Sequence, residues 1–101
     1  MQPSIGRIVQ YTLSAGDVTV INQRRAALKA ALQAGGEPSP YIGNTVEAGQ
    51  VYPAQIVRHF GGTTVNLKVA LDGADDYWAT SRTEHSGDGD GHGSWVWPAR
   101  V

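Results

Sequence analysis

The side chains that could do chemistry in this sequence are three histidines, scattered serines and a short run of carboxylates. The histidines are His59, His85 and His92. No Ser-His-Asp order comes with a nucleophile-elbow motif, and the sequence contains no HExxH motif and no cysteine to pair with a histidine. This pattern favours a protein that is not an enzyme and that uses no cofactor.

The run from His85 to His92, HSGDGDGH, places two carboxylates two residues apart between two imidazoles. Spaced carboxylates of this kind are typical of calcium loops. The bidentate glutamate that completes such a loop is missing, because its position would fall beyond Trp97. A solvated turn accounts for the Gly-Asp repeat equally well, so we expect no metal site.

The aromatic residues carry the second kind of chemistry, which is base stacking. Trp95 and Trp97 lie two residues apart and therefore point to the same face of a strand, with Val96 opposite. We expect at least one of these rings in the core. Three tryptophans and four tyrosines exceed what so small a core encloses, so another ring should remain near the surface. An exposed ring beside an arginine is a natural platform for a base.

The candidate binding residues follow from this division. Four aromatic residues are candidates for stacking, three arginines for contacts with phosphate, and one asparagine for a base edge. In that order they are Tyr11, Trp78, Trp95 and Trp97; Arg58 with Arg24 or Arg25; and Asn66.

Composition narrows the class of protein. The chain of 101 residues has room for one domain, residues 1–101. Its net charge of −1 hides a basic cluster at residues 24–29 and an acidic C-terminal third, without the dominating basic face of a duplex-binding protein. The chain has no cysteine, no apolar run long enough for a bilayer and no signal-peptide pattern at its start. We therefore expect a soluble, intracellular protein with no membrane or duplex partner.

Helical signals occupy one stretch near the start of the chain. Residues 5–13 have strand composition, and Ser14 with Asp17 three residues later resembles a capping box. The alanine, leucine, arginine and lysine that follow predict a helix to about residue 34, ended by two glycines and by Pro38. Its apolar face is predicted to hold Val18, Ile21, Leu28 and Leu32, with Arg25 intruding.

The rest of the chain has the pattern of strands and turns. We expect an irregular loop at residues 37–50, strands at 51–60, 65–71, 77–81 and 94–97, a hairpin turn at the glycine pair 61–62 and a glycine-rich loop at 84–93. Short turns between consecutive strands favour an antiparallel meander. The predicted fold class is α+β, mainly β: a small SH3-like barrel or curled sheet of about five strands, with one helix after the first strand.

Several segments together resemble a family of small proteins of bacteriophages that infect actinobacteria. They are PSIGRIVQYTL, VYPAQIVRHF, VNLKVALDG followed by YWATS, and GSWVWP. The resemblance covers nearly the whole chain except the helix and the loop after it. The first strand of this family typically reads GRIVHY and its end WHWP, so Gln10 and Val96 stand here where the family has histidines.

The resemblance implies a phage protein. By analogy with phage proteins that sequester the cyclic nucleotide signals of CBASS or Thoeris immunity, we expect a non-catalytic homo-oligomer, a dimer or tetramer. Its ligand would be a cyclic dinucleotide or a cyclic ADP-ribose, bound in the cytoplasm of the infected host. One alternative is a virion protein that decorates the capsid, and another is a regulator that binds a host protein through the helix.

Overall fold

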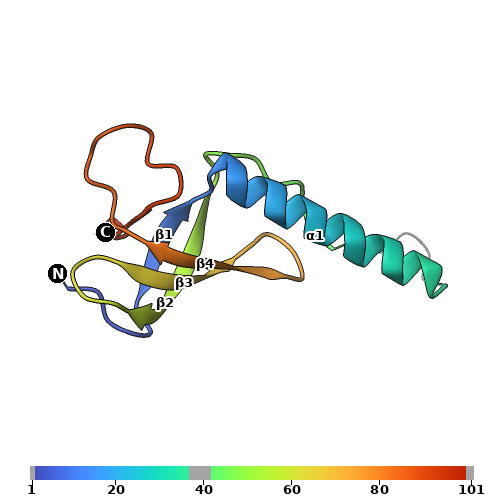
Figure 1. The fold of residues 1–101 in the computed structure, drawn as a ribbon, viewed down its shortest axis with the longest axis horizontal. Coiled ribbons are helices and arrows are strands. Elements are labelled where there is room, and N and C mark those ends of the chain that lie inside the picture. The colour runs from blue at the N-terminus through green and yellow to red at the C-terminus, as the bar shows by residue number, and fades with distance from the viewer. Residues whose placement is uncertain (1, 37–41, 100–101) are drawn as a thin grey trace.

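The computed structural model describes residues 2–36 and 42–99. One helix follows the first of five strands (Figure 1). In chain order the elements are β1 (Ile8–Thr12), α1 (Ala15–Ala34), β2 (Val51–His59), β3 (Val65–Ala70), β4 (Asp76–Arg82) and β5 (Trp95–Val96). The predicted α+β class, with the helix after the first strand, is confirmed.

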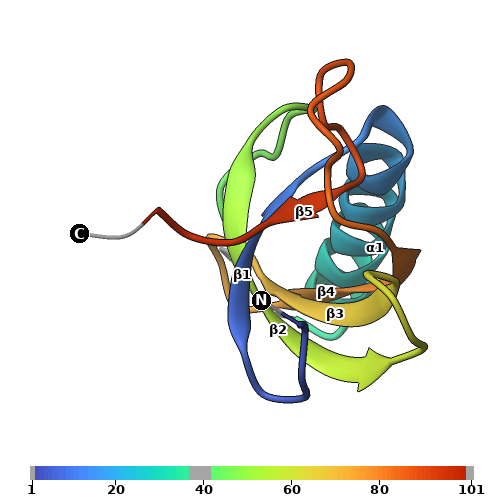
Figure 2. The ribbon, with the colours of Figure 1, turned by 90° about the vertical axis from the view of Figure 1, so that its left-hand side faces the viewer.

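The strands form one antiparallel sheet in the order β4-β3-β2-β1-β5. The sheet curls but does not close, so of the two architectures expected the curled sheet is the one observed (Figure 2). The segment after β4 still reaches β5, because Trp95 donates its backbone N–H to Thr83 and accepts from His85. This short parallel bridge is what replaces full closure.

The alternation in β3 divides the sheet into an inner and an outer face. Val65, Leu67 and Val69 are buried, while Lys68 and Ala70, at alternate positions, are exposed. This confirms the period-2 pattern, since successive side chains of a strand point to opposite faces. The register shifts at two places, between Ile56 and Arg58 of β2 and opposite Asn66 of β3.

The core lies between the inner face of the sheet and the first turns of α1. Its largest fully buried side chains are Trp95, Tyr11, Leu13, Ile21, Ile56 and Leu67. Tyr52 and Trp97 are partly buried against this cluster. Every strand contributes at least one buried residue, so the core depends on long-range packing rather than on any single hairpin.

The start of α1 follows its local sequence closely. Ser14 accepts a hydrogen bond from the backbone N–H of Asp17, and Asp17 accepts one from the backbone N–H of Ser14. This is the reciprocal capping box that the sequence predicts, which satisfies two helix-end donors. At the other end, Gly35 closes the helix by donating its N–H to Ala31 and Leu32.

The face of α1 that meets the sheet differs from the prediction. The buried residues of the helix are Asp17, Ile21 and Arg25, while Leu28 is 45% exposed. The core ends at the level of Arg25, and the helix continues past it (Figure 1). The molecule therefore measures 49 Å along one axis and only 27 and 26 Å along the others.

The structure describes only part of the loop between α1 and β2. Residues 42–50 are irregular, as predicted, and connect to the β3–β4 turn through a bridge between Gly43 and Gly73. Residues 37–41, with Pro38, lie outside the described residues. In the part of the chain that is described, no helix has both the length and the apolarity that crossing a bilayer requires.

Candidate functional site

Two of the four predicted stacking residues belong to the core. Tyr11 and Trp95 are both fully buried. The indole of Trp95 donates its Nε1–H to the backbone oxygen of Thr63, 3.1 Å away, which satisfies the one polar group of the ring. Neither ring presents a face to solvent, so their role here is structural.

The hydroxyl group of Tyr11 explains why that ring is buried. It donates to Asp17 Oδ2 at 2.5 Å, and Tyr77 donates to Asp17 Oδ1 at 2.7 Å. Arg82 Nη2 lies 3.0 Å from the same Oδ1. We name these four residues the Asp17 cluster. It ties the first turn of α1 to β1 and to β4.

Charge and burial act in opposite directions within the Asp17 cluster. Burial raises the pKa of Asp17. The Ser14 N–H, the two tyrosine hydroxyls and Arg82 lower it by more, so the pKa of Asp17 lies below its ordinary value. Burial and the bond to Asp17 raise the pKa of both Tyr11 and Tyr77. The carboxylate is therefore held charged and the phenols neutral. Such an arrangement suits a structural clamp.

The predicted phosphate ligands Arg24 and Arg25 are bound to one aspartate. Arg25 Nε and Nη2 lie 3.0 and 2.7 Å from the two oxygens of Asp75, and Arg24 Nη2 lies 2.8 Å from Asp75 Oδ2. Arg25 also donates through Nη1 to the backbone oxygen of Asn44. The hydrogen bonds from Arg25, and then those from Arg24, lower the pKa of Asp75 to about 2. Both arginines thus brace α1 against the β3–β4 turn.

Arg58 and Asn66 also have local partners. The Arg58 guanidinium lies over the ring of Phe60, 5.5 Å from its centroid. The Asn66 side chain accepts from the backbone N–H of Ser81 at 2.7 Å, and Ser81 has a positive φ of 53° at the irregular point of β4. Asn66 therefore stabilises an unusual backbone conformation.

Trp97 lies at the edge of the core. Its ring meets that of Trp95 edge to face at a centroid distance of 5.3 Å. The guanidinium of Arg7 lies 5.2 Å from the Trp97 centroid. This is a partly exposed ring beside an arginine, as the sequence led us to expect, but one face of the ring is already occupied by that arginine.

Trp78 is the predicted stacking residue whose ring is largely exposed to solvent. It is 62% exposed, because its neighbours Tyr77 and Ala79 take the inward positions of β4. Lys68 of β3 lies directly opposite it, and Gln55 of β2 lies opposite Lys68. Three outward side chains from adjacent strands thus form a row: a ring, a cation and an amide.

A shallow groove of about 250 Å³ runs beside this row on the outer face of the sheet. We name the groove and the adjoining tryptophan the Trp78 face, which comprises Ile8, Pro53, Gln55, Lys68, Ala70, Asp76 and Trp78. Ile8 is half exposed. Lys68 and Asp76 form an exposed ion pair at 3.4 Å, which is weak enough for the lysine to turn towards a ligand.

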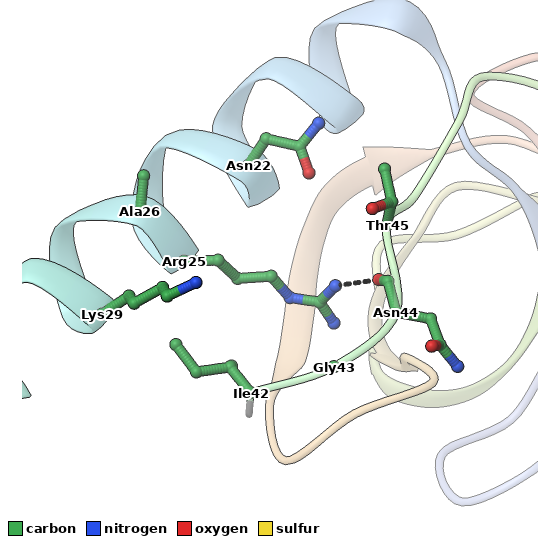
Figure 3. A pocket seen from close by; sticks show the side chains of 8 residues that line it. All are labelled: Asn22, Arg25, Ala26, Lys29, Ile42, Gly43, Asn44 and Thr45. Carbon is green, nitrogen blue, oxygen red and sulfur yellow. Dashed lines mark hydrogen bonds between the residues drawn. The ribbon is translucent and has the colours of Figure 1, made fainter. Parts of the chain in front are cut away.

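A second groove, which we name the α1 groove, lies between α1 and residues 42–45 (Figure 3). Its volume is about 340 Å³, and it is lined by Asn22, Arg25, Ala26, Lys29, Ile42, Gly43, Asn44 and Thr45. Arg25 points across it to Asn44 (Figure 3). Because Arg25 is engaged, Lys29 is the cation left in this groove, and none of the lining residues carries an aromatic ring.

The sequence did not single out Gln55 or Lys68. Alternation within β3 indicates that Lys68 points outward, but only the pairing of β3 with β2 and β4 places it between Gln55 and Trp78. Pairing also places Gln10 of β1 opposite Val96 of β5. Both face outward beside the Trp78 face.

Comparison with known proteins adds no functional assignment. No family model, no curated protein and no solved structure matches this chain.

Proposed function

We propose that this protein is a non-enzymatic phage counter-defence protein that sequesters a cyclic nucleotide signal on its Trp78 face. The observation that carries the proposal is the exposed indole of Trp78 with Lys68 directly opposite it on the next strand. A base would stack on Trp78, its phosphate would lie against Lys68, and Gln55 would bond to the base edge.

The binding free energy that one Trp78 face can supply determines whether a single copy of the protein is enough to hold the ligand. Stacking of one base on an aromatic side chain contributes about 1–3 kcal/mol. A sponge for a scarce signal requires nanomolar affinity, which corresponds to about −12 kcal/mol. One open face cannot reach this value. The binding unit in this proposal is therefore a homo-oligomer, a dimer or tetramer, in which a second Trp78 face covers the other side of the ligand.

The test is calorimetry with a panel of cyclic dinucleotides, cyclic trinucleotides and cyclic ADP-ribose isomers. We expect Trp78→Ala to weaken binding at least about fivefold, the lower end of the stacking range, and Trp78→Phe to restore part of the loss. Lys68→Ala should weaken binding and reduce its dependence on salt. Thr80→Ala, the next outward position of β4, is the matched control and should bind as the parent does.

A second candidate function, a virion protein that decorates the capsid, is favoured by the length of α1 that projects beyond the core. A projecting helix is a means of attachment to another protein surface. Mass spectrometry of purified virions separates the two candidates. Absence of binding across the whole nucleotide panel, with the protein abundant in virions, would overturn the sponge proposal.

A further inference from the structure

The last nine residues of α1 extend beyond the core of the molecule. From Ala26 to Ala34 every residue is exposed except Leu32, which is partly exposed. At 1.5 Å per residue this segment is about 13 Å long. Most of the stability of a helix in a protein comes from packing of its amphipathic face rather than from helix propensity. In the part of the chain that the structure describes, no core residue covers this segment of the helix.

The apolar residues of this segment continue the seam that packs on the sheet. Val18, Ile21, Arg25, Leu28 and Leu32 follow one another at steps of three, four, three and four residues. This is the spacing of helix-to-helix contacts. Ile21 and Arg25 are buried against the core, and Val18 packs against it, whereas Leu28 is 45% exposed. Past the Arg25–Asp75 ion pair, the residues of this seam therefore no longer belong to the core.

Near this row of residues the chain carries both a basic and an acidic side chain, Lys29 and Asp72. After Asp17, the charged residues of α1 are Arg24, Arg25 and Lys29, all basic. Lys29 lines the α1 groove and, among residues 2–36 and 42–99, has no ion-pair partner. Asp72 lies behind the opposite wall of this groove, where it accepts a hydrogen bond from Asn44, and it likewise has no ion-pair partner in the described part of the chain.

We propose that the projecting end of α1 is a self-association surface whose occupant is the same segment of a second copy. The two helix ends lie antiparallel across a two-fold axis and bury Leu28 and Leu32. Lys29 of each copy faces Asp72 of the other. A two-fold contact uses one patch twice, so a patch that carries both the cation and the carboxylate fits a second copy better than it fits an unrelated protein.

This contact is separate from the Trp78 face and does not depend on the proposed ligand. α1 packs on the inner side of the sheet, while the Trp78 face is on the outer side. The two contacts together would give a tetramer: α1 pairs copies without ligand, and the ligand then joins pairs. Experiments on α1 are therefore made without nucleotide.

The first experiment is light scattering over a range of protein concentrations. We expect the parent to be a dimer and the double variant Leu28→Asp/Leu32→Asp to be a folded monomer, with the circular dichroism spectrum of the parent, since neither leucine belongs to the core cluster. Ala30→Asp is the matched control. It adds one negative charge, where the double variant adds two, on the side of the same helix away from the seam, and it should remain a dimer. A parent that stays monomeric, or a control that dissociates like the leucine variant, would overturn the proposal.

The second experiment tests the charge pair, and it also separates self-association from binding to a different protein. Lys29→Glu and Asp72→Lys should each raise the dimer dissociation constant about tenfold or more, because each pair occurs twice in a two-fold contact. The variant with both changes should regain dimerisation. If Asp72→Lys disturbs the bond to Asn44, Lys29→Gln and Asp72→Asn serve instead and should weaken the dimer equally. Failure of the double reversal to restore the dimer would contradict the Lys29–Asp72 contact.

Discussion

Replacing Asp17 by asparagine should destabilise the fold strongly, although the two side chains have nearly the same shape. The Asp17 carboxylate is 1% exposed and accepts hydrogen bonds from two tyrosines, one arginine and the backbone of Ser14. An asparagine keeps one oxygen and turns the other into a donor. In one orientation that donor would face the Tyr11 hydroxyl and the Ser14 N–H, which both donate to Oδ2. In the other orientation it would face the Tyr77 hydroxyl and Arg82, which both donate to Oδ1.

The magnitude follows from the charge that is left behind. Removing one partner of a buried ion pair costs about 3–5 kcal/mol. The Arg82 side chain is 27% exposed, so water partly solvates it, and we take the lower end of that range. We therefore expect a loss of about 3 kcal/mol in the free energy of unfolding. For a domain of this size, this corresponds to a fall in Tm of roughly 12–24 °C.

Chemical denaturation of parent and variant at neutral pH measures this loss. Asp90→Asn is the control, because the Asp90 side chain is 71% exposed and should lose no more than about 0.5 kcal/mol. A loss below about 1 kcal/mol for Asp17→Asn would refute the reasoning. It would mean that the Asp17 cluster does not hold α1 to the sheet.

The remaining predictions concern pH and two glycines. The pKa of Asp75 is about 2, and that of Asp17 is also below its ordinary value of 3.8, so both carboxylates stabilise the fold above about pH 4. Denaturation titrations should show that stability is lost as the pH falls from about 4 towards about 2. Asp75→Asn should reduce this loss. The raised pKa of Tyr77 gives stability that is present below pH 10 and lost above it, so Tyr77→Phe should flatten the alkaline limb of the same titration. Gly43→Ala should cost about 1–3 kcal/mol by thermal unfolding, because its Cβ would lie 2.7 Å from a backbone oxygen. Gly16→Ala should instead stabilise by about 0.5–1 kcal/mol, since Gly16 is helical and its Cβ would meet no atom closer than 3.8 Å; a loss at Gly16 would contradict this.

Elements stabilised by near neighbours in the chain were predictable from the sequence. The capping box joins Ser14 to Asp17, three residues on, and the end of α1 involves Gly35 and residues three and four before it. The outward and inward sides of β3 follow from alternation alone. These features depend on backbone geometry that repeats every two or every 3.6 residues, so residue types at short spacing determine them.

The candidate site was predictable only in part. The exposed ring that the excess of aromatics predicted is present as Trp78, but the sequence could not distinguish it from Tyr11 or Trp95, which are buried. Arg25 looked like a break in an apolar face or a phosphate ligand. It is a buried brace whose partner, Asp75, lies 50 residues away. Nothing at short spacing marks such a partner.

Local sequence therefore determined which segments are helix and strand, where α1 begins and ends, and which side chains of a strand share a face. Tertiary structure decided what those side chains meet. Asp17 reaches Tyr77 and Arg82 across 60 and 65 residues, and Lys68 lies beside Trp78 because β3 and β4 pair in one register. The physical reason is that register and packing are set by the combined burial of all five strands and the first turns of α1. A slip of one residue would turn a whole strand inside out, and no short stretch of sequence carries that information.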